Sequence, residues 1–106
     1  MKRIEAIFKP FKLDEIKEAL KKEKLERISL CEVRGAGRQQ VYPERYRGVS
    51  YFEDSAEVSI AMIVDDDDAE RIAQMLVRAL QTGELCDGEV AITPVERLVR
   101  VRVGHR

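Results

Sequence analysis

The sequence predicts an α+β fold in which two β-α-β halves form one antiparallel sheet with helices on one side. Three observations predict it. Apolar and polar residues alternate in residues 3–9, as in a strand with one buried side, and residues 58–64 are all small or apolar. A helical stripe of apolar residues follows each of these segments. The length of 106 residues suits one domain, so we expect residues 1–106 to fold as a single unit.

The first half opens with a strand and a helix. In residues 3–9, Ile4, Ala6 and Phe8 share one face, and Pro10 ends the strand. The period then changes to that of an amphipathic helix, whose apolar stripe consists of Leu13, Ile16, Ala19 and Leu20. Both elements therefore have one side that we expect to be buried.

A second strand and a long loop follow. Residues 28–33 alternate as a strand does, and Gly35 and Gly37 end this strand by opening a loop. No period is sustained beyond them, so we expect roughly 18 residues of irregular chain up to Ser55. Loops of that length in compact domains tend to be functional, which makes this one the first place to look for a function.

The second half repeats the order of strand and helix. Residues 58–64 are expected to form a central strand that is buried on both faces. The helix after it is defined by an apolar stripe of Ala69, Ile72, Ala73, Leu76, Val77 and Leu80. Residues 65–68 are all aspartates, and we interpret them as favourable negative charge at the helix N-terminus rather than as a metal site.

The segment after this helix supplies the last strand. Asp87 with Gly88 predicts a tight turn, and residues 89–92 predict a short strand. Valines and arginines then alternate in residues 97–103, which we expect to be the final strand. The order is therefore βαββαβ with one short additional strand.

One face of the predicted sheet is covered by helices and the other is open. The residues expected on the open face are Arg3, Glu5, Ser29, Ala61, Arg100 and Arg102, together with Ile7 and Ile63. This mixture of charged, small and apolar side chains suits an interface better than open water. We therefore expect the protein to associate with copies of itself.

The charge composition limits the partners. Nineteen basic and twenty acidic residues leave a formal net charge of -1, so we expect neither a nucleic-acid partner nor insertion into a membrane. No apolar stretch is long enough to span a bilayer and the sequence shows no signal peptide, which predicts a cytoplasmic protein. Cys31 and Cys86 have no metal-ligand spacing and are interpreted as reduced thiols.

Arginines form the first candidate binding site. Arg100 and Arg102 project from the same side of one predicted strand, and guanidinium groups bind phosphate through two parallel hydrogen bonds. A multivalent anion such as a phosphate therefore fits between them. For these two residues alone, the alternative is a solvated strand face with paired carboxylates.

Glycine turns form the second candidate. Gly35, Gly37 and Arg38 follow a strand and offer backbone N–H groups to an anion, without the spacing of a Rossmann or Walker motif. Asp87 and Gly88 form another turn, for which an ordinary hairpin is the alternative. The sequence shows no nucleophile elbow, no Cys/His pair and no catalytic carboxylates, so we expect a protein that is not an enzyme.

Short segments along nearly the whole chain carry a family resemblance. They read MKRIEAI at residues 1–7, KPFKLDE at 9–15, KEAL at 17–20, EVRGAGRQ at 32–39, YRG at 46–48, QTG at 81–83, DG at 87–88 and RVR at 100–102. Tyr51 adds a further match. In this order they resemble the PII signal-transduction family, also called nitrogen regulatory protein P-II.

The resemblance implies a ferredoxin-like sandwich that forms a homotrimer, with ATP or ADP in each cleft between subunits. It also implies a T-loop, about residues 37–55, that docks on a target such as a transporter or a metabolic enzyme, and a B-loop, about residues 82–89. The implied nucleotide-site residues are Ser29 and Ile63 near the adenosine, Gly35, Gly37, Arg38, Asp87 and Gly88 near the phosphates, and Arg100 and Arg102 from the adjacent subunit.

Departures from the family pattern concern the choice of ligand. Glu89 stands where a B-loop lysine ordinarily reaches the phosphates, so we expect ADP or AMP to bind better than ATP. Glu57 stands at the place of a lysine that, with Gln39 and magnesium-ATP, holds 2-oxoglutarate in the family. We therefore expect 2-oxoglutarate to bind weakly or not at all.

Two tyrosines are the remaining candidate residues of the T-loop. Tyr46 lies within a matching segment, and Tyr51 stands at the position that some family members uridylylate. Val49 and Ser50 beside it depart from the usual pair, so an interface anchor is the alternative role for Tyr51.

These features predict a nucleotide-sensing regulator of a partner protein. It acts in nitrogen assimilation or, like divergent PII-like proteins that respond to ADP, AMP or bicarbonate, in inorganic-carbon uptake linked to carboxysomes. Glu57 and Glu89 favour the second pathway. The alternative is a trimeric ferredoxin-like metal-tolerance protein that uses the aspartates and cysteines, and a small anion-binding hydrolase comes third.

Overall fold

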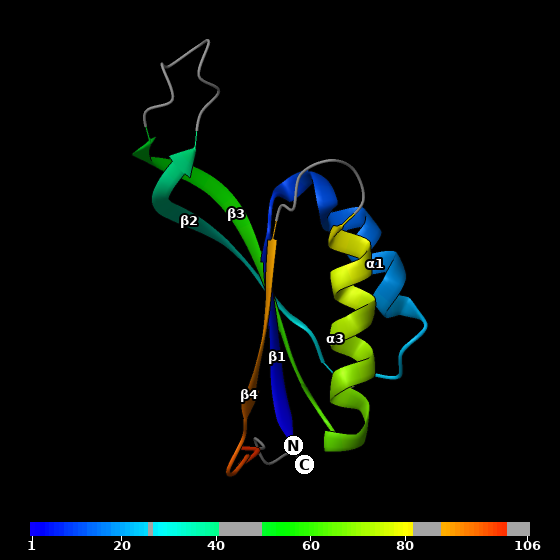
Figure 1. Cartoon of the computed structure of the whole chain (residues 1–106). Coiled ribbons are helices and arrows are strands. Elements are labelled where there is room, and N and C mark those ends of the chain that lie inside the picture. Colours follow the sequence, from blue (N-terminus) through cyan, green and yellow to red (C-terminus); the bar gives the residue numbers. More distant parts are fainter. Residues whose placement is uncertain (26, 41–49, 82–87, 102–106) are drawn as a thin grey trace, which may run out of the picture.

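The computed structural model of the chain describes residues 1–25, 27–40, 50–81 and 88–101. Its elements are β1 (Lys2–Phe8), the 3₁₀ turn η1 (Pro10–Lys12), α1 (Leu13–Lys21), β2 (Ser29–Gln40), β3 (Ser50–Val64), α3 (Asp66–Leu80) and β4 (Gly88–Pro94). The strands form one antiparallel sheet in the order β2-β3-β1-β4, and both helices cover the same face (Figure 1). This arrangement confirms the predicted α+β, ferredoxin-like sandwich.

The core lies between the sheet and the two helices, and the predicted alternation of β1 forms its centre. Ile4, Ala6 and Phe8 are completely buried. The helices contribute residues of the predicted stripes, namely Ile16 and Leu20 from α1 and Ala69, Ile72, Ala73, Leu76 and Leu80 from α3. Truncation of one buried Ile or Leu side chain to Ala typically costs about 2–5 kcal/mol, so these contacts hold the helices against the sheet. No helix in the described ranges is long and apolar enough to cross a membrane.

β3 lies between β2 and β1, as expected of a central strand. Its helix-facing residues are buried, but on the open face only Ser59 is buried, while Ala61 and Ile63 are partly exposed. Ala61 and Ile63 are therefore only partly buried on the open face of the single chain, where no helix of the described residues packs against them.

The distal parts of β2 and β3 correct the predicted loop. The two strands stay paired residue by residue along the whole of β2, so residues 37–40 and 50–55 are strand and not irregular chain. Gly35 and Gly37, which were expected to open a turn, lie within β2. Backbone hydrogen bonds extend this hairpin away from the helices (Figure 1), where no core imposes an apolar alternation. Residues 41–49 of the predicted T-loop lie outside the described residues.

β4 corrects the predicted end of the chain. It pairs with β1 along its whole length and is the fourth strand of the sheet, with Gly88 as its first residue. Residues 95–101 are not a strand, although the sequence predicted one over residues 97–103. A strand needs a hydrogen-bonding partner as well as an alternating sequence, and β4, not residues 95–101, takes the place beside β1.

The aspartate run lies at the start of α3, as predicted. Asp65 precedes the helix in an extended conformation and makes no side-chain cap hydrogen bond. The Met1 ammonium donates to Asp66 at 2.7 Å, which lowers the pKa of Asp66, and Arg71 donates to Asp68 at 3.3 Å. In the described part of the chain, no group of three or more His, Cys, Asp or Glu side chains could hold a metal ion.

Candidate functional site

The open face of the sheet carries six of the side chains that the sequence assigned to it, namely Arg3, Glu5, Ile7, Ser29, Ala61 and Ile63, whereas Arg102 lies outside the described residues. The register places Ala61 of β3 opposite Glu5 of β1 on one side and opposite Ser29 of β2 on the other. Side chains at such opposed positions share a face of the sheet. The next row pairs Ile63 with Arg3, so cationic, apolar and small side chains are neighbours here.

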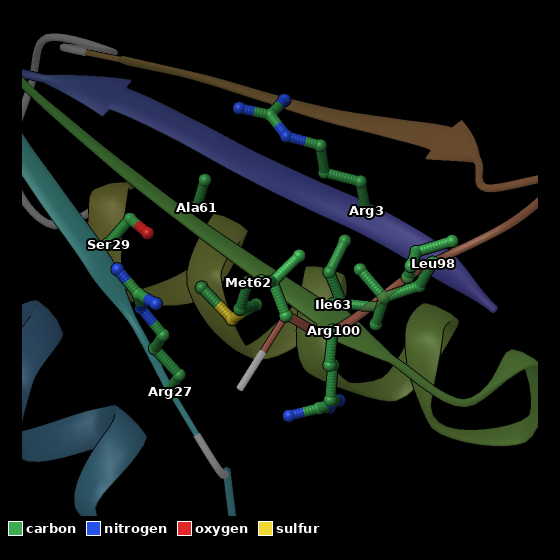
Figure 2. A pocket seen from close by; sticks show the side chains of 10 residues that line it. Arg3, Arg27, Ser29, Ala61, Met62, Ile63, Leu98 and Arg100 are labelled. Atoms are coloured by element: carbon green, nitrogen blue, oxygen red, sulfur yellow. The ribbon is translucent and has the colours of Figure 1, made fainter. Parts of the chain in front are cut away.

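A cavity of about 560 Å³ lies on this face (Figure 2). It is lined by Arg3, Arg27, Ser29, Ala61, Met62, Ile63, Leu98, Val99, Arg100 and Val101. Three arginines thus accompany a mostly apolar lining, and no carboxylate belongs to the described residues that line the cavity. The combination suits a ligand with an apolar body and a negatively charged group.

The positive charge of Arg3 is partly offset by the neighbouring carboxylate of Glu5. Its Nη1 lies 3.4 Å from Glu5 Oε1, and Ser59 Oγ donates to Glu5 Oε2 at 2.9 Å. The Ser59 hydrogen bond, followed by that from Arg3, lowers the pKa of Glu5, although burial acts in the opposite direction. Glu5 is therefore ionised at neutral pH, and it reduces the positive charge that Arg3 offers to a ligand.

Arg100 lies in the terminal segment beside the open face. Figure 2 shows its guanidinium pointing away from Arg3. It also lines a second cavity of about 510 Å³, and Ile63 and Leu98 line both cavities with it. Arg100 is therefore part of the boundary between the two cavities.

The structure brings Ser29 and Ile63 together in one cavity, which Arg100 of the same chain also lines, whereas the resemblance implied that Arg100 reaches the site from the adjacent subunit. Other predicted residues lie on the two edge strands of the sheet, with Gly35, Gly37 and Arg38 on β2 and Gly88 and Glu89 on β4. Two strands separate these edges, so one chain does not bring the two groups together. The resemblance assigns the site to a cleft between subunits, which is consistent with this separation.

Several predicted residues receive little or no structural description. Asp87, Arg102 and Tyr46 lie outside the described residues. Gln39 and Tyr51 are opposite each other in the β2–β3 ladder. Gln39 and Tyr51 therefore lie on the hairpin, and their roles in target contact and modification stay predictions.

The two glutamates that depart from the family pattern have different surroundings. Glu89 is exposed on β4 opposite Ile7, a register that puts it on the open face. Glu57 lies on β3, and its Oε2 is 3.8 Å from Lys9 Nζ. Glu57 therefore has a cationic neighbour within its own chain.

Arg27 is the cavity residue that sequence reasoning missed. It precedes β2 and was not included in the predicted second strand. A signal was present, because Arg27 lies two residues before Ser29 and an extended chain places such residues on the same face.

The fold and the cavity define a ferredoxin-like domain with an arginine-lined cavity on its open sheet face. The family model described as Nitrogen regulatory protein P-II matches residues 1–105. Curated proteins named Nitrogen regulatory protein P-II include one from Azospirillum brasilense, 44% identical over 107 residues that cover 100% of this chain and 96% of the relative. The protein of that name from Bradyrhizobium diazoefficiens is 45% identical, with 99% and 95% covered, and that from Nostoc punctiforme is 41% identical, with 100% and 96% covered.

The chain therefore belongs to the P-II family. This membership confirms the resemblance and decides against the metal-tolerance family. The names of the relatives describe regulatory proteins and not enzymes.

Proposed function

We propose that this chain is a cytoplasmic PII-type signal-transduction regulator that works as a homotrimer. It binds an adenine nucleotide in clefts between subunits and controls a target protein, such as a transporter or a metabolic enzyme, through the T-loop at the end of the β2–β3 hairpin. The observation that carries the proposal is the arginine-bearing cavity on the open sheet face. Its lining includes Ser29 and Ile63, which the family resemblance assigns to the adenosine, and Arg100, which the resemblance assigns to the nucleotide of the adjacent subunit.

The chemistry of the cavity supports a nucleotide. Ile63, Leu98 and Val99 offer apolar surface to a planar base, and guanidinium groups offer paired N–H donors to phosphate oxygens. The positive charge is confined to the arginines around this cavity, because the whole chain has a formal net charge of -1. Attraction of an anion therefore depends on this face of the sheet and not on the charge of the protein as a whole.

Glu89 supports a preference for ADP or AMP over ATP. It adds an exposed carboxylate to the sheet edge that the resemblance places beside the phosphates. Repulsion from a carboxylate grows with the number of phosphate charges, so the nucleotide with the longest chain loses the most affinity. Replacement of Glu89 by lysine is expected to strengthen ATP binding roughly tenfold relative to AMP.

The Lys9–Glu57 ion pair supports our expectation that 2-oxoglutarate binds weakly or not at all. A dicarboxylate that approaches this position is repelled by the Glu57 carboxylate. The Lys9 ammonium, which could attract it, already lies 3.8 Å from Glu57 Oε2. Both effects oppose the entry of another carboxylate. Bicarbonate, which carries one negative charge, is the smaller anion that we propose as a further ligand.

The pathway has two candidates. The relatives named Nitrogen regulatory protein P-II favour control of nitrogen metabolism. Glu57 and Glu89 favour the second candidate, a role in inorganic-carbon uptake that responds to ADP, AMP or bicarbonate. In either pathway the T-loop, with Gln39, Tyr46 and Tyr51, is the proposed contact with the target, and Tyr51 is the proposed site of modification.

Calorimetric titration tests the function. AMP, ADP and ATP are each titrated with and without magnesium, 2-oxoglutarate and bicarbonate. The proposal predicts binding of all three nucleotides, with ATP the weakest, and no gain from 2-oxoglutarate. Tight magnesium-ATP binding that 2-oxoglutarate strengthens contradicts the roles given to Glu57 and Glu89. No binding of any nucleotide contradicts the proposed function itself.

A further inference from the structure

The second cavity, of about 510 Å³, lies where α1 ends and α3 begins. Figure 1 shows these helix ends at the opposite end of the molecule from the outer end of the β2–β3 hairpin. Among the described residues that the family resemblance assigns to the nucleotide, only Ile63 and Arg100 line this cavity. Its described lining also contains lysines and carboxylates, which that of the open-face cavity does not, so the two cavities differ in chemistry.

Several charges around the second cavity are matched within the chain. Arg71 Nη1 donates to Glu23 Oε2 at 2.7 Å, and Arg71 Nη2 donates to Asp68 Oδ1 at 3.3 Å. The Met1 ammonium donates to Asp66. The Arg71 contacts join the end of α1 to the start of α3, so these groups build the wall of the cavity and offer little net charge to a ligand.

Apart from Arg100, the charged side chains of the lining that remain are those of Lys22, Lys24 and Asp65. All three residues are exposed, and in the ranges that the structure describes none of their side chains forms a hydrogen bond or an ion pair. The two lysines lie just after α1, and Asp65 directly precedes α3. The cavity therefore offers positive charge from one helix end and negative charge from the other.

Apolar side chains complete the lining. Val64 and Ile72 are 6% and 2% exposed, and Leu25 packs against the core beside them. A simple anion is repelled by the aspartate and a simple cation by the two lysines, whereas a zwitterion pairs with both. The volume lies within the range of about 300–1,000 Å³ that is typical of small-molecule sites. The lining therefore fits a small zwitterion that has an apolar part.

We propose that the second cavity binds an α-amino acid with an apolar side chain. The carboxylate of the amino acid contacts Lys22 and Lys24, its ammonium contacts Asp65, and its side chain lies against Val64 and Ile72. This inference goes beyond the proposed function, because none of these five residues belongs to the predicted nucleotide site.

Saturation-transfer NMR of the full-length protein with three related ligands tests the inference. L-Leucine carries both charges, 4-methylpentanoate lacks the ammonium, and 3-methylbutylamine lacks the carboxylate. L-Leucine is expected to bind about fivefold more tightly than either analogue, because each analogue loses an ion pair with an exposed group.

Variants assign the two charges of the ligand to the two helix ends. Lys22→Gln combined with Lys24→Gln should weaken L-leucine binding about fivefold without weakening 3-methylbutylamine binding. Asp65→Asn keeps a side chain suited to the helix N-cap, and it should weaken L-leucine binding similarly without weakening 4-methylpentanoate binding. The matched controls Lys17→Gln and Asp67→Asn remove exposed charges of the same helices that do not line the cavity, and they should leave every affinity unchanged.

Three outcomes overturn the inference. One is a wild-type protein that does not bind L-leucine, and the second is equal binding of all three ligands, which indicates apolar contact alone. The third is an L-leucine affinity that neither the lysine variant nor Asp65→Asn changes. Titration of the same samples with ADP measures the proposed function separately, because the inference assigns no nucleotide contact to the substituted residues.

Discussion

Replacement of Glu57 by lysine reverses the charge beside Lys9 at the base of the β2–β3 hairpin. The contact between Lys9 Nζ and Glu57 Oε2 measures 3.8 Å, and the two side chains are 29% and 27% exposed. Two unit charges at this distance attract by about 1 kcal/mol in water, and two lysines repel by a similar amount. Because partly exposed pairs contribute about 0.2–1 kcal/mol, we expect the reversal to lower the free energy of unfolding by about 1 kcal/mol.

Thermal unfolding at low salt and at about 1 M salt, where the Debye length is about 3 Å, measures this effect. Glu57→Lys should lower Tm by about 4–8 °C at low salt and by much less at high salt. Glu57→Gln removes the attraction without adding repulsion, so its Tm should lie between those of the wild type and Glu57→Lys. Equal Tm values for wild type and Glu57→Lys at low salt, or a difference that salt does not change, refute the reasoning.

Two further predictions concern the fold. Gly88→Ala should lower the free energy of unfolding by about 1–3 kcal/mol, since a Cβ atom there would lie 2.7 Å from the carbonyl oxygen of Ile7. Unfolding in urea measures this loss, and an unchanged free energy contradicts the close approach of β4 to β1. Asp66→Asn removes the partner of the Met1 ammonium. The lowered pKa of Asp66 means that its carboxylate stabilises the fold above its unfolded pKa of about 3.9, and that this stabilisation is lost as the pH falls through the folded pKa. The stability difference between wild type and variant should therefore be present at neutral pH and disappear in strong acid; persistence in acid contradicts the ion pair.

The parts of the fold that the sequence predicted correctly are those where packing imposes a period. Ile4, Ala6 and Phe8 had to face the helices, and each helix had to present its apolar stripe to the sheet. Binary patterning therefore located β1, α1, α3 and the proximal part of β3. It did not locate the paired residues 50–55, because backbone hydrogen bonds extend this part of the hairpin away from the helical core.

For residues 97–101 the sequence predicted a strand that the structure does not contain. The alternating valines and arginines of this segment indicated a strand, but β4 takes the place beside β1 in the structure. Alternation describes the two sides of an extended chain and says nothing about a partner for its hydrogen bonds. Arg100 nevertheless lines the open-face cavity, so its predicted position beside the open face was correct although its strand was wrong, and its role in binding stays a prediction.

The candidate site was predictable only in part. Ser29 and Ile63 followed from the family resemblance and line the cavity with Arg100. Arg27 was missed because it lies just before β2, where the apolar alternation had not begun. Gly35 and Glu89 lie on opposite edges of the sheet, and a site that unites such edges requires more than one chain.

Sedimentation of the protein with ADP, monitored at the absorbance of adenine, tests the central claim most directly. The account predicts that ADP sediments with a homotrimer, at one nucleotide per chain. ADP that sediments free of the protein, or that binds single chains as well as it binds the trimer, contradicts the claim that the nucleotide site is formed between subunits.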